Sequence, residues 1–345
     1  MNLAVRALAV TFVPGQSFAN SLLGNFWLAL VVKLILVMGI VLLAPLVVIY
    51  SELKIMAHMQ HRLGPMYAGR FHGVGQPIAD GIKLIQKEDV VPAAADSWVF
   101  TLAPAVVLVP YIALFVVLPF SNTLFAENLD IGIFYALALS AVSVIGILMA
   151  GWASANKFSL IGALRAAAQL IAYELPMILA AVAVVMQAGT LSLVGISEAQ
   201  THYWYVLTQP LMFVVFLIAA LAELTRTPFD MPIAESEIIF GAYTEYTGMK
   251  FGMLMLSEYA GIIAFSGIAS VLFLGGFRPL PGLAFIPGPI WMLAKIGLLA
   301  FLVIWLRVTY PRLREDQLQR ISWVVLIPIA LADILVTAVI KVAVK

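Results

Sequence analysis

The carboxylates of this sequence are concentrated in one stretch, between Glu223 and Tyr259. This segment holds six of the 18 acidic residues of the chain. They are Glu223, Asp230, Glu235, Glu237, Glu245 and Glu258. Carboxylates that lie close together in a poorly hydrated place can share and pass on protons. The stretch therefore indicates either a hydrated surface loop or a site of proton and charge chemistry beside a membrane.

The composition decides what kind of protein surrounds these acids. Apolar residues make up 63% of the chain and charged residues 11%, whereas soluble domains have about 45–50% and about 25%. The sequence therefore predicts an integral membrane protein. A net charge of +1 gives no electrostatic case for nucleic acid as a partner. The absence of cysteine excludes Cys-ligated iron–sulfur clusters within this chain, and the four histidines lack metal-binding spacing, so we predict no metal site.

Eight apolar segments are long enough to cross about 30 Å of hydrocarbon. An unpaired backbone is prohibitive in lipid, so each segment should be helical. We therefore predict an all-α integral membrane protein with about eight transmembrane helices, forming one polytopic membrane domain over residues 1–345. Residues 1–20 should form a short terminal segment, which could lie as a helix at the membrane interface. The predicted spans lie near 26–49, 98–119, 131–152, 166–187, 205–225, 251–274, 288–308 and 321–342.

Basic residues are distributed unequally among the loops that connect the predicted spans. The first, third, fifth and seventh loops carry 13 of the 19 basic residues, whereas the second, fourth and sixth carry only Arg278. By the positive-inside rule the odd loops face the cytoplasm, and an even number of spans then places both termini outside. The acidic stretch lies in the fifth loop, on the predicted cytoplasmic side.

Two cytoplasmic loops contain predicted helices. The segment from Gln76 to Asp89 places Ile78, Ile82 and Ile85 at helical spacing among charged residues, which indicates an amphipathic helix along the membrane or under a partner. In the acidic stretch, Asp230 should cap a short helix over residues 231–240 that ends at Gly241.

Four carboxylates fall at similar predicted depths on four different spans: Glu52, Glu174, Glu223 and Glu258. Ionisable residues inside a membrane are costly and are candidates for function. If these four converge on one cavity, they could exchange protons.

Local pairing is the alternative explanation for these acids. Glu223 could pair with Arg226, three residues later, and Glu52 could pair with Lys54 or Arg62. Glu174 and Glu258 could each form a structural hydrogen bond with a neighbouring helix.

Several long motifs resemble one known family. They are ELTRTPFDMPIAESE (223–237), YTEYTGMKFGMLMLSEY (243–259), GWASANKFSLIGALRAAAQLIAYELPM (151–177), QHRLGP, QPIADGIKLIQKED and YPRLREDQL. In order and spacing they resemble the H subunit of bacterial proton-translocating NADH:quinone oxidoreductase (complex I), the counterpart of mitochondrial subunit 1. The resemblance covers the chain from about residue 26 to its end.

The resemblance implies a subunit of the respiratory-chain translocase in the bacterial inner (plasma) membrane, which is not catalytic alone. Its implied partners are cluster-bearing peripheral-arm subunits on the cytoplasmic loops, small membrane subunits, antiporter-like subunits, lipid and quinone. NADH, flavin and iron–sulfur clusters would belong to partner subunits, with quinone as the substrate and no cofactor bound by this chain alone.

The resemblance also implies two sets of site residues. The implied quinone-chamber residues are Glu52, Arg62, Asp80, Lys83, Glu223, Arg226, Asp230, Glu235, Glu237, Arg307 and Arg312. The implied proton-relay residues are Glu174, Glu245 and Glu258.

The sequence departs from the family pattern at a few positions. Leu53, Met66 and Tyr67 stand where the family usually has basic or amide residues, and Ile233 stands where it usually has Glu. These positions bear on contacts with the quinone headgroup and on the coupling route.

Three other functions remain open at this point. One is the equivalent subunit of a membrane-bound hydrogenase or a related reductase complex. Another is a stand-alone ion transporter, which the lack of an internal repeat disfavours. The third is a purely structural anchor.

Overall fold

The computed structural model describes residues 26–69, 71–279 and 285–343. Within these ranges the chain is helical, without strands, and seven helices are long and apolar enough to cross a membrane. This confirms the predicted all-α membrane fold. The predicted interfacial segment 1–20 lies outside the described residues.

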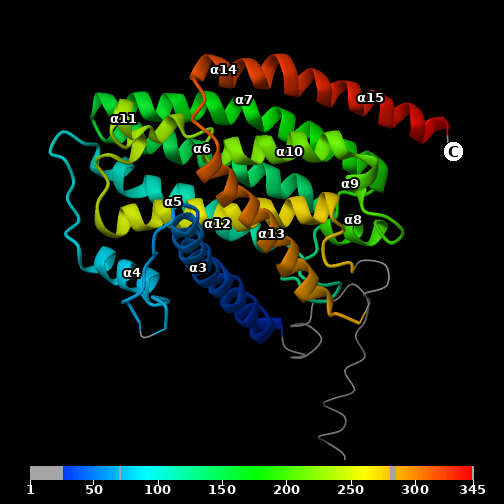
Figure 1. Ribbon diagram of the computed structural model, residues 1–345, viewed down its shortest axis with the longest axis horizontal. Helices are drawn as coiled ribbons and strands as arrows, with labels where there is room; N and C mark the ends of the chain where they lie inside the picture. The colour runs from blue at the N-terminus through cyan, green and yellow to red at the C-terminus, as the bar shows by residue number, and fades with distance from the viewer. Residues whose placement is uncertain (1–25, 70, 280–284, 344–345) are drawn as a thin grey trace, which may run out of the picture.

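Most of the long helices run side by side, and α3 and α13 cross them obliquely (Figure 1). The long helices are α3 (Phe26–Met59), α5 (Ser97–Leu114), α6 (Gly132–Ala153), α7 (Lys157–Ala188), α10 (Pro210–Glu223), α12 (Gly248–Phe273), α13 (Gly288–Thr309) and α15 (Ile327–Ala343). α12 lies at the centre, in contact with α3, α5, α10 and α13. In the apolar segment of α12, 83% of the residues are buried, whereas in the α14–α15 segment at the edge of the bundle only 17% are buried.

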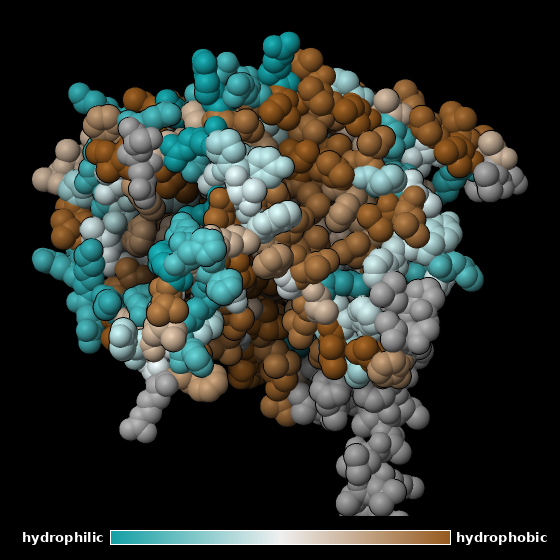
Figure 2. Space-filling view, viewed as in Figure 1, coloured by the Kyte–Doolittle hydropathy of each residue, from teal (hydrophilic) through white to brown (hydrophobic). Residues whose placement is uncertain are grey.

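The short helices mark the two ends of this bundle. α4 (Gln76–Gln86) and α11 (Glu235–Ile238) lie at one end, and α8 (Leu193–Ala199) and α9 (Tyr205–Thr208) lie at the other (Figure 1). α14 (Glu315–Arg320) leads through a π-helical turn, Ile321–Leu326, into α15. Polar side chains gather over α4 and α14, and apolar side chains cover α13 and α15 (Figure 2).

α10 differs most from its predicted span, 205–225. Pro210 lacks a backbone N–H, and the chain turns at Gln209 between α9 and α10. The 14 residues of α10 extend about 21 Å, less than the about 30 Å of a hydrocarbon core. α7 is longer than its predicted span, 166–187, because it begins at Lys157. Arg165 therefore lies on a helix rather than in a loop.

The predicted helix over residues 231–240 is wrong. The chain forms a 3-10 turn, η1 (Met231–Ile233), then α11, then a second 3-10 turn, η2 (Gly241–Tyr243). Asp230 makes no capping hydrogen bond, because its carboxylate is engaged by a guanidinium from the segment after α13. The predicted helix at 76–89 is present as α4, and its Ile78, Ile82 and Ile85 are exposed.

Gly241 allows the two turns to fold against each other. Its φ is +55°, and a Cβ at this position would lie 1.8 Å from the Pro232 carbonyl oxygen. Gly162 of α7 packs on the same backbone, where its own Cβ would lie 2.5 Å from the Cα of Gly241. These two glycines therefore hold the acidic stretch close to α7.

Replacing Gly241 with Ala should prevent this packing. Left-handed backbone costs a residue with a Cβ about 1–2 kcal/mol, and the clash with Pro232 adds to it. We expect markedly less folded protein in membranes, measured by limited proteolysis and thermal unfolding. Gly39→Ala is the matched control, because nothing lies within 4 Å of its Cβ position. Equal stability of both variants would contradict this account.

Candidate functional site

The candidate site forms where the chain leaves α10. Arg226 lies three residues after the helix and is only 3% exposed. Thr225, just before it, has a φ of +49°, a conformation that costs about 1–3 kcal/mol. Gln169 of α7 holds both sides of this loop, because its Nε2 donates to the carbonyl oxygens of Ala222 (2.8 Å) and Phe229 (2.7 Å). Buried hydrogen bonds therefore fix the backbone that carries Arg226.

Arg226 joins carboxylates from two other helices. Its Nη1 donates to Glu52 Oε1 and Oε2 of α3 at 3.0 and 2.9 Å. Its Nε lies 2.7 Å from Glu258 Oε1 of α12, an ion pair in which the N–H is not aligned as a hydrogen bond. The guanidinium also lies over the Tyr259 ring, 4.6 Å from the ring centre. Burial lowers the pKa of Arg226, but the charges of Glu258 and Glu52 outweigh it and hold the pKa above its ordinary value, so the group stays charged.

Two further arginines reach this region from the chain around the end of α13. Arg307 pairs with Glu52, which therefore lies between two guanidinium groups. Arg312 pairs with Asp230, with Nε 2.7 Å from Oδ1 and Nη2 donating to Oδ2 at 2.9 Å. The Leu313 N–H donates to the Pro228 carbonyl at 3.1 Å and ties the two segments together.

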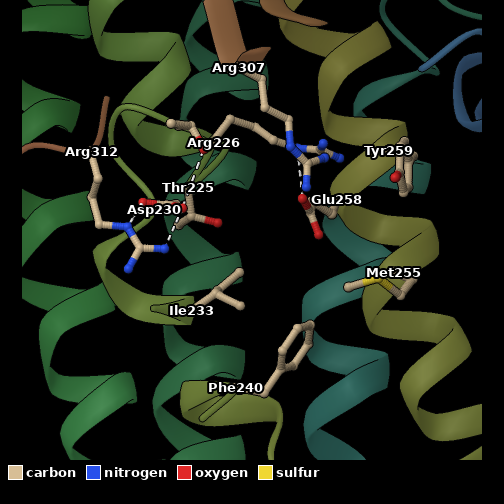
Figure 3. A pocket seen from close by; sticks show the side chains of 11 residues that line it. Thr225, Arg226, Asp230, Ile233, Phe240, Met255, Glu258, Tyr259, Arg307 and Arg312 are labelled. Atoms are coloured by element: carbon tan, nitrogen blue, oxygen red, sulfur yellow. Dashed lines mark hydrogen bonds and ion pairs between the residues drawn. The ribbon is translucent and has the colours of Figure 1, made fainter. Parts of the chain in front are cut away.

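These groups surround a cavity of about 320 Å³. Its charged side chains lie along one end, and Ile233, Phe240 and Met255 form an apolar end (Figure 3). Arg226 and Arg307 extend from different elements toward Glu258 (Figure 3). The complete lining is Thr225, Arg226, Thr227, Asp230, Ile233, Phe240, Met255, Glu258, Tyr259, Arg307 and Arg312.

A second group of acids lies behind this cavity. Glu223 at the end of α10 is 5% exposed, and its Oε2 has no hydrogen-bond partner among the described residues. The half-buried Glu174 of α7 acts on it electrostatically. The buried Tyr111 of α5 interacts electrostatically with both Glu223 and Glu258 and is hydrogen bonded with Ser143. Tyr111 is therefore electrostatically coupled to one acid in the cavity wall and to one outside the cavity lining.

Several predicted site residues converge here. The structure brings together Glu52, Arg226, Asp230, Glu258, Arg307 and Arg312. The local pairing alternatives are wrong for Glu52 and Arg226, because these two groups pair with each other across the bundle rather than with neighbours along the chain. Both groups are 3% exposed, and a buried charge requires the strongest available counter-charge.

Three other predicted chamber residues lie on the surface, away from the cavity lining. Arg62 is exposed and donates to Gln60. Asp80 and Lys83 of α4 pair with each other at 3.6 Å, with side chains that are 45% and 74% exposed.

The remaining acids of the stretch lie in other contacts. Glu237 pairs with Arg165 of α7 at 2.6 Å, and Glu245 accepts a hydrogen bond from Asn156 at 2.6 Å. Both contacts fasten the stretch to the start of α7, outside the cavity lining. The side chain of Glu235 lies outside the described part of the chain.

The departures from the family pattern fall in two places. Ile233 lies in the cavity wall. Met66 and Tyr67 lie outside it. The Met66 Sδ accepts a hydrogen bond from Lys54 Nζ at 3.2 Å, and the Tyr67 side chain is fully exposed. Of these departures, the one at Ile233 changes the cavity directly, by making its wall more apolar.

Sequence reasoning missed Tyr111, Gln169 and Tyr243 as members of this region. Burial, together with the nearby Glu258 charge, raises the pKa of Tyr243, so its hydroxyl keeps its proton. A polar side chain within a long apolar segment was the available signal for Tyr111 and Gln169. That signal does not say which face of the helix the side chain lies on.

Fold and site together define an α-helical membrane protein with a charged cavity near one end of its bundle. A sequence profile described as NADH dehydrogenase matches residues 32–338. The chain belongs to this family, as a membrane subunit of the NADH-quinone oxidoreductase (complex I) type that is not catalytic alone.

Curated relatives agree with this assignment. The H subunit of NADH-quinone oxidoreductase from Bacillus thuringiensis (strain Al Hakam) is 47% identical over 293 residues, which cover 85% of this chain and 88% of the relative. The H subunits from Bacillus mycoides (strain KBAB4) and Bacillus cereus (strain AH187) match with the same identity and coverage. The predicted resemblance is confirmed, and membership of this family speaks against the hydrogenase-type and transporter alternatives.

Proposed function

We propose that the charged cavity receives a quinone headgroup and that this chain couples quinone reduction to proton translocation. The observation that carries the proposal is Arg226, a buried guanidinium in the cavity wall that holds carboxylates from α3 and α12. A group that binds two helices and also faces a ligand site can transmit a change in ligand charge to the helices.

The two ends of the cavity suit the two parts of a quinone. Guanidinium groups can donate hydrogen bonds to the carbonyl oxygens of the headgroup. The end formed by Ile233, Phe240 and Met255 offers apolar surface to the ring and the start of the isoprenoid tail.

Reduction of a quinone to a quinol adds a pair of electrons and a pair of protons. The electrons would come from an iron–sulfur cluster of a partner subunit. Negative charge that develops on the headgroup would compete with Glu52 and Glu258 for the donors of Arg226 and Arg307. A carboxylate that loses its counter-charge in a buried site takes up a proton more readily. Headgroup reduction would thereby favour proton uptake at the cavity wall.

A proton path from this wall would lead deeper into the bundle. Glu258, Tyr111, Glu223 and Glu174 interact electrostatically one with the next, which supports a relay in this order. Glu245, bound to Asn156 at the surface end, would serve proton entry rather than the buried part of the path.

The assembly follows from the same proposal. The single polytopic domain would lie in the bacterial inner membrane, with α4, α11 and α14 on the cytoplasmic side and both termini outside. Arg62, Asp80, Lys83 and Glu237 would then contact cluster-bearing peripheral-arm subunits. Small membrane subunits and antiporter-like subunits would contact the helices around Glu174.

A photoreactive short-chain quinone analogue tests the proposed site in the assembled complex. We expect labelling of the segments that carry Ile233, Phe240 and Met255, and loss of that label with excess unlabelled quinone. Met255→Trp should reduce labelling because the indole fills the apolar end of the cavity. Met253→Trp is the matched control, since Met253 is on the same helix but outside the lining. Labelling confined to the loop around Arg62 and Asp80 would refute the assignment.

A further inference from the structure

A second cavity lies near the opposite end of the bundle. It has a volume of about 340 Å³ and lies between α3, the segment after α5, α12 and α13. Its walls are almost entirely apolar, with Val37, Ile40, Leu118, Ile263 and Ile296 among the lining side chains. Nothing in the chemistry proposed for the charged cavity uses this space.

The length of this apolar cavity along α3 matches one leaflet of a bilayer. Its lining on α3 runs from Lys33 to Ala44. Eleven residues at about 1.5 Å each give about 16 Å, roughly half of the about 30 Å hydrocarbon core. Lys33 pairs at 3.0 Å with Glu127, whose side chain is 56% exposed. This ion pair marks the polar end of the cavity.

A polar pocket adjoins that same end. The apolar cavity is lined by Phe120 and Pro289, and the polar pocket by their chain neighbours Ser121 and Gly288. The polar pocket also contains Arg278, whose buried Nε has no hydrogen-bond partner among the described residues. A guanidinium group in the lining of a polar pocket, beside an apolar cavity of leaflet length, is complementary to an anionic headgroup with a hydrocarbon chain.

We propose that the paired cavities bind one anionic phospholipid of the leaflet at the α8–α9 end, with its phosphate at Arg278 and one acyl chain beside Val37 and Ile40. Phosphate accepts the charge-assisted hydrogen bond that Arg278 offers. The acyl chain fills a space that would otherwise lack contacts with its apolar walls. The bound lipid joins α3 to α13 on the face away from the charged cavity.

Photo-crosslinking in the assembled complex tests this site. The complex is reconstituted in phosphatidylcholine nanodiscs with a phosphatidylglycerol that carries a diazirine midway along one acyl chain. We expect crosslinks to α3 near Ile40 and to α13 near Ile296, removed by unlabelled phosphatidylglycerol. Arg278→Gln should weaken competition by phosphatidylglycerol about tenfold, the effect of losing one charged hydrogen bond. It should also reduce the preference over phosphatidylcholine, which carries the same phosphate but no net charge. Arg278→Lys keeps the positive charge and should retain much of both.

Two tryptophan variants of α3 separate this site from general lipid contact. Ile40→Trp should abolish the crosslinks because it fills the cavity. Leu43→Trp should leave them unchanged, because Leu43 is 65% exposed and is not among the lining residues. Crosslinks that spread evenly over α3, or that palmitate removes as well as phosphatidylglycerol does, would overturn the proposal. So would an unchanged lipid preference in a folded Arg278→Gln complex.

Discussion

Arg226→Gln is expected to abolish quinone reduction by the assembled complex. The substitution leaves Glu52 and Glu258 without the counter-charge that joins them, and Glu52 is only 3% exposed. Removal of one partner from a buried ion pair costs about 3–5 kcal/mol. At about 1.4 kcal/mol per factor of ten, the equilibrium constant for the active arrangement would fall by at least about a hundredfold. The measurement is NADH:quinone reductase activity per assembled complex.

A surface arginine provides the matched control for Arg226. Arg314 pairs with Asp316 while its side chain is 80% exposed, and exposed pairs contribute little. Arg314→Gln should therefore retain activity. The double variant Arg226→Gln with Glu258→Gln removes both charges of one pair and should assemble better than Arg226→Gln alone. Full activity of an assembled Arg226→Gln complex would rule out the proposed role of the guanidinium.

Glu223→Gln is expected to stop proton pumping while much of the quinone binding remains. Glutamine keeps the size of the side chain but cannot release or carry a proton at this position. Glu223 does not line the charged cavity, and its Oε2 has no hydrogen-bond partner among the described residues, so the substitution breaks no hydrogen bond there. The measurement is the proton gradient formed by reconstituted vesicles per quinone reduced. Glu174→Gln and Glu258→Gln should also strongly reduce pumping.

An exposed glutamate outside the path serves as control for this series. Glu198 on α8 is exposed at the far end of the bundle, and Glu198→Gln should pump normally. Tyr111→Phe tests the proposed intermediate residue, because it removes only the hydroxyl of a side chain that interacts electrostatically with both Glu223 and Glu258. Normal proton pumping in all four single variants, Glu174→Gln, Glu223→Gln, Glu258→Gln and Tyr111→Phe, would rule out the proposed relay.

The backbone of the acidic stretch is held in place against α7, and this limits how the proposed relay could work. Gln169 and Gly241 fix the acidic stretch on α7 by hydrogen bonds and close backbone contact. In the proposed relay, the charged side chains at the cavity would therefore change partners while the backbone stays in place. A change of charge in the cavity then acts first on ion pairs rather than on the position of the loop.

The sequence was enough to predict the membrane class, the all-helical fold and the family, because these follow from composition, apolar length and long motifs. It also identified Glu52 and Glu258 as candidates, since charge within an apolar span is rare, and Arg226 through the family motif. Their partners were decided by the tertiary structure. Glu52 and Arg226 are 174 residues apart along the chain and meet within 3.0 Å, a contact that no local spacing predicts.

The short helix predicted in the acidic stretch illustrates the same limit. The residues around Asp230 fit a helix-capping pattern, but Asp230 pairs with Arg312, 82 residues later, instead of capping the turn. A charge-assisted pair with a guanidinium is stronger than one neutral capping hydrogen bond. Five of the six acids that first defined the stretch have described side chains, and the fold divides these five into cavity, surface and buried groups. Periodicity determines which face of a helix is apolar, whereas long-range packing decides which charges from separate helices share one buried space.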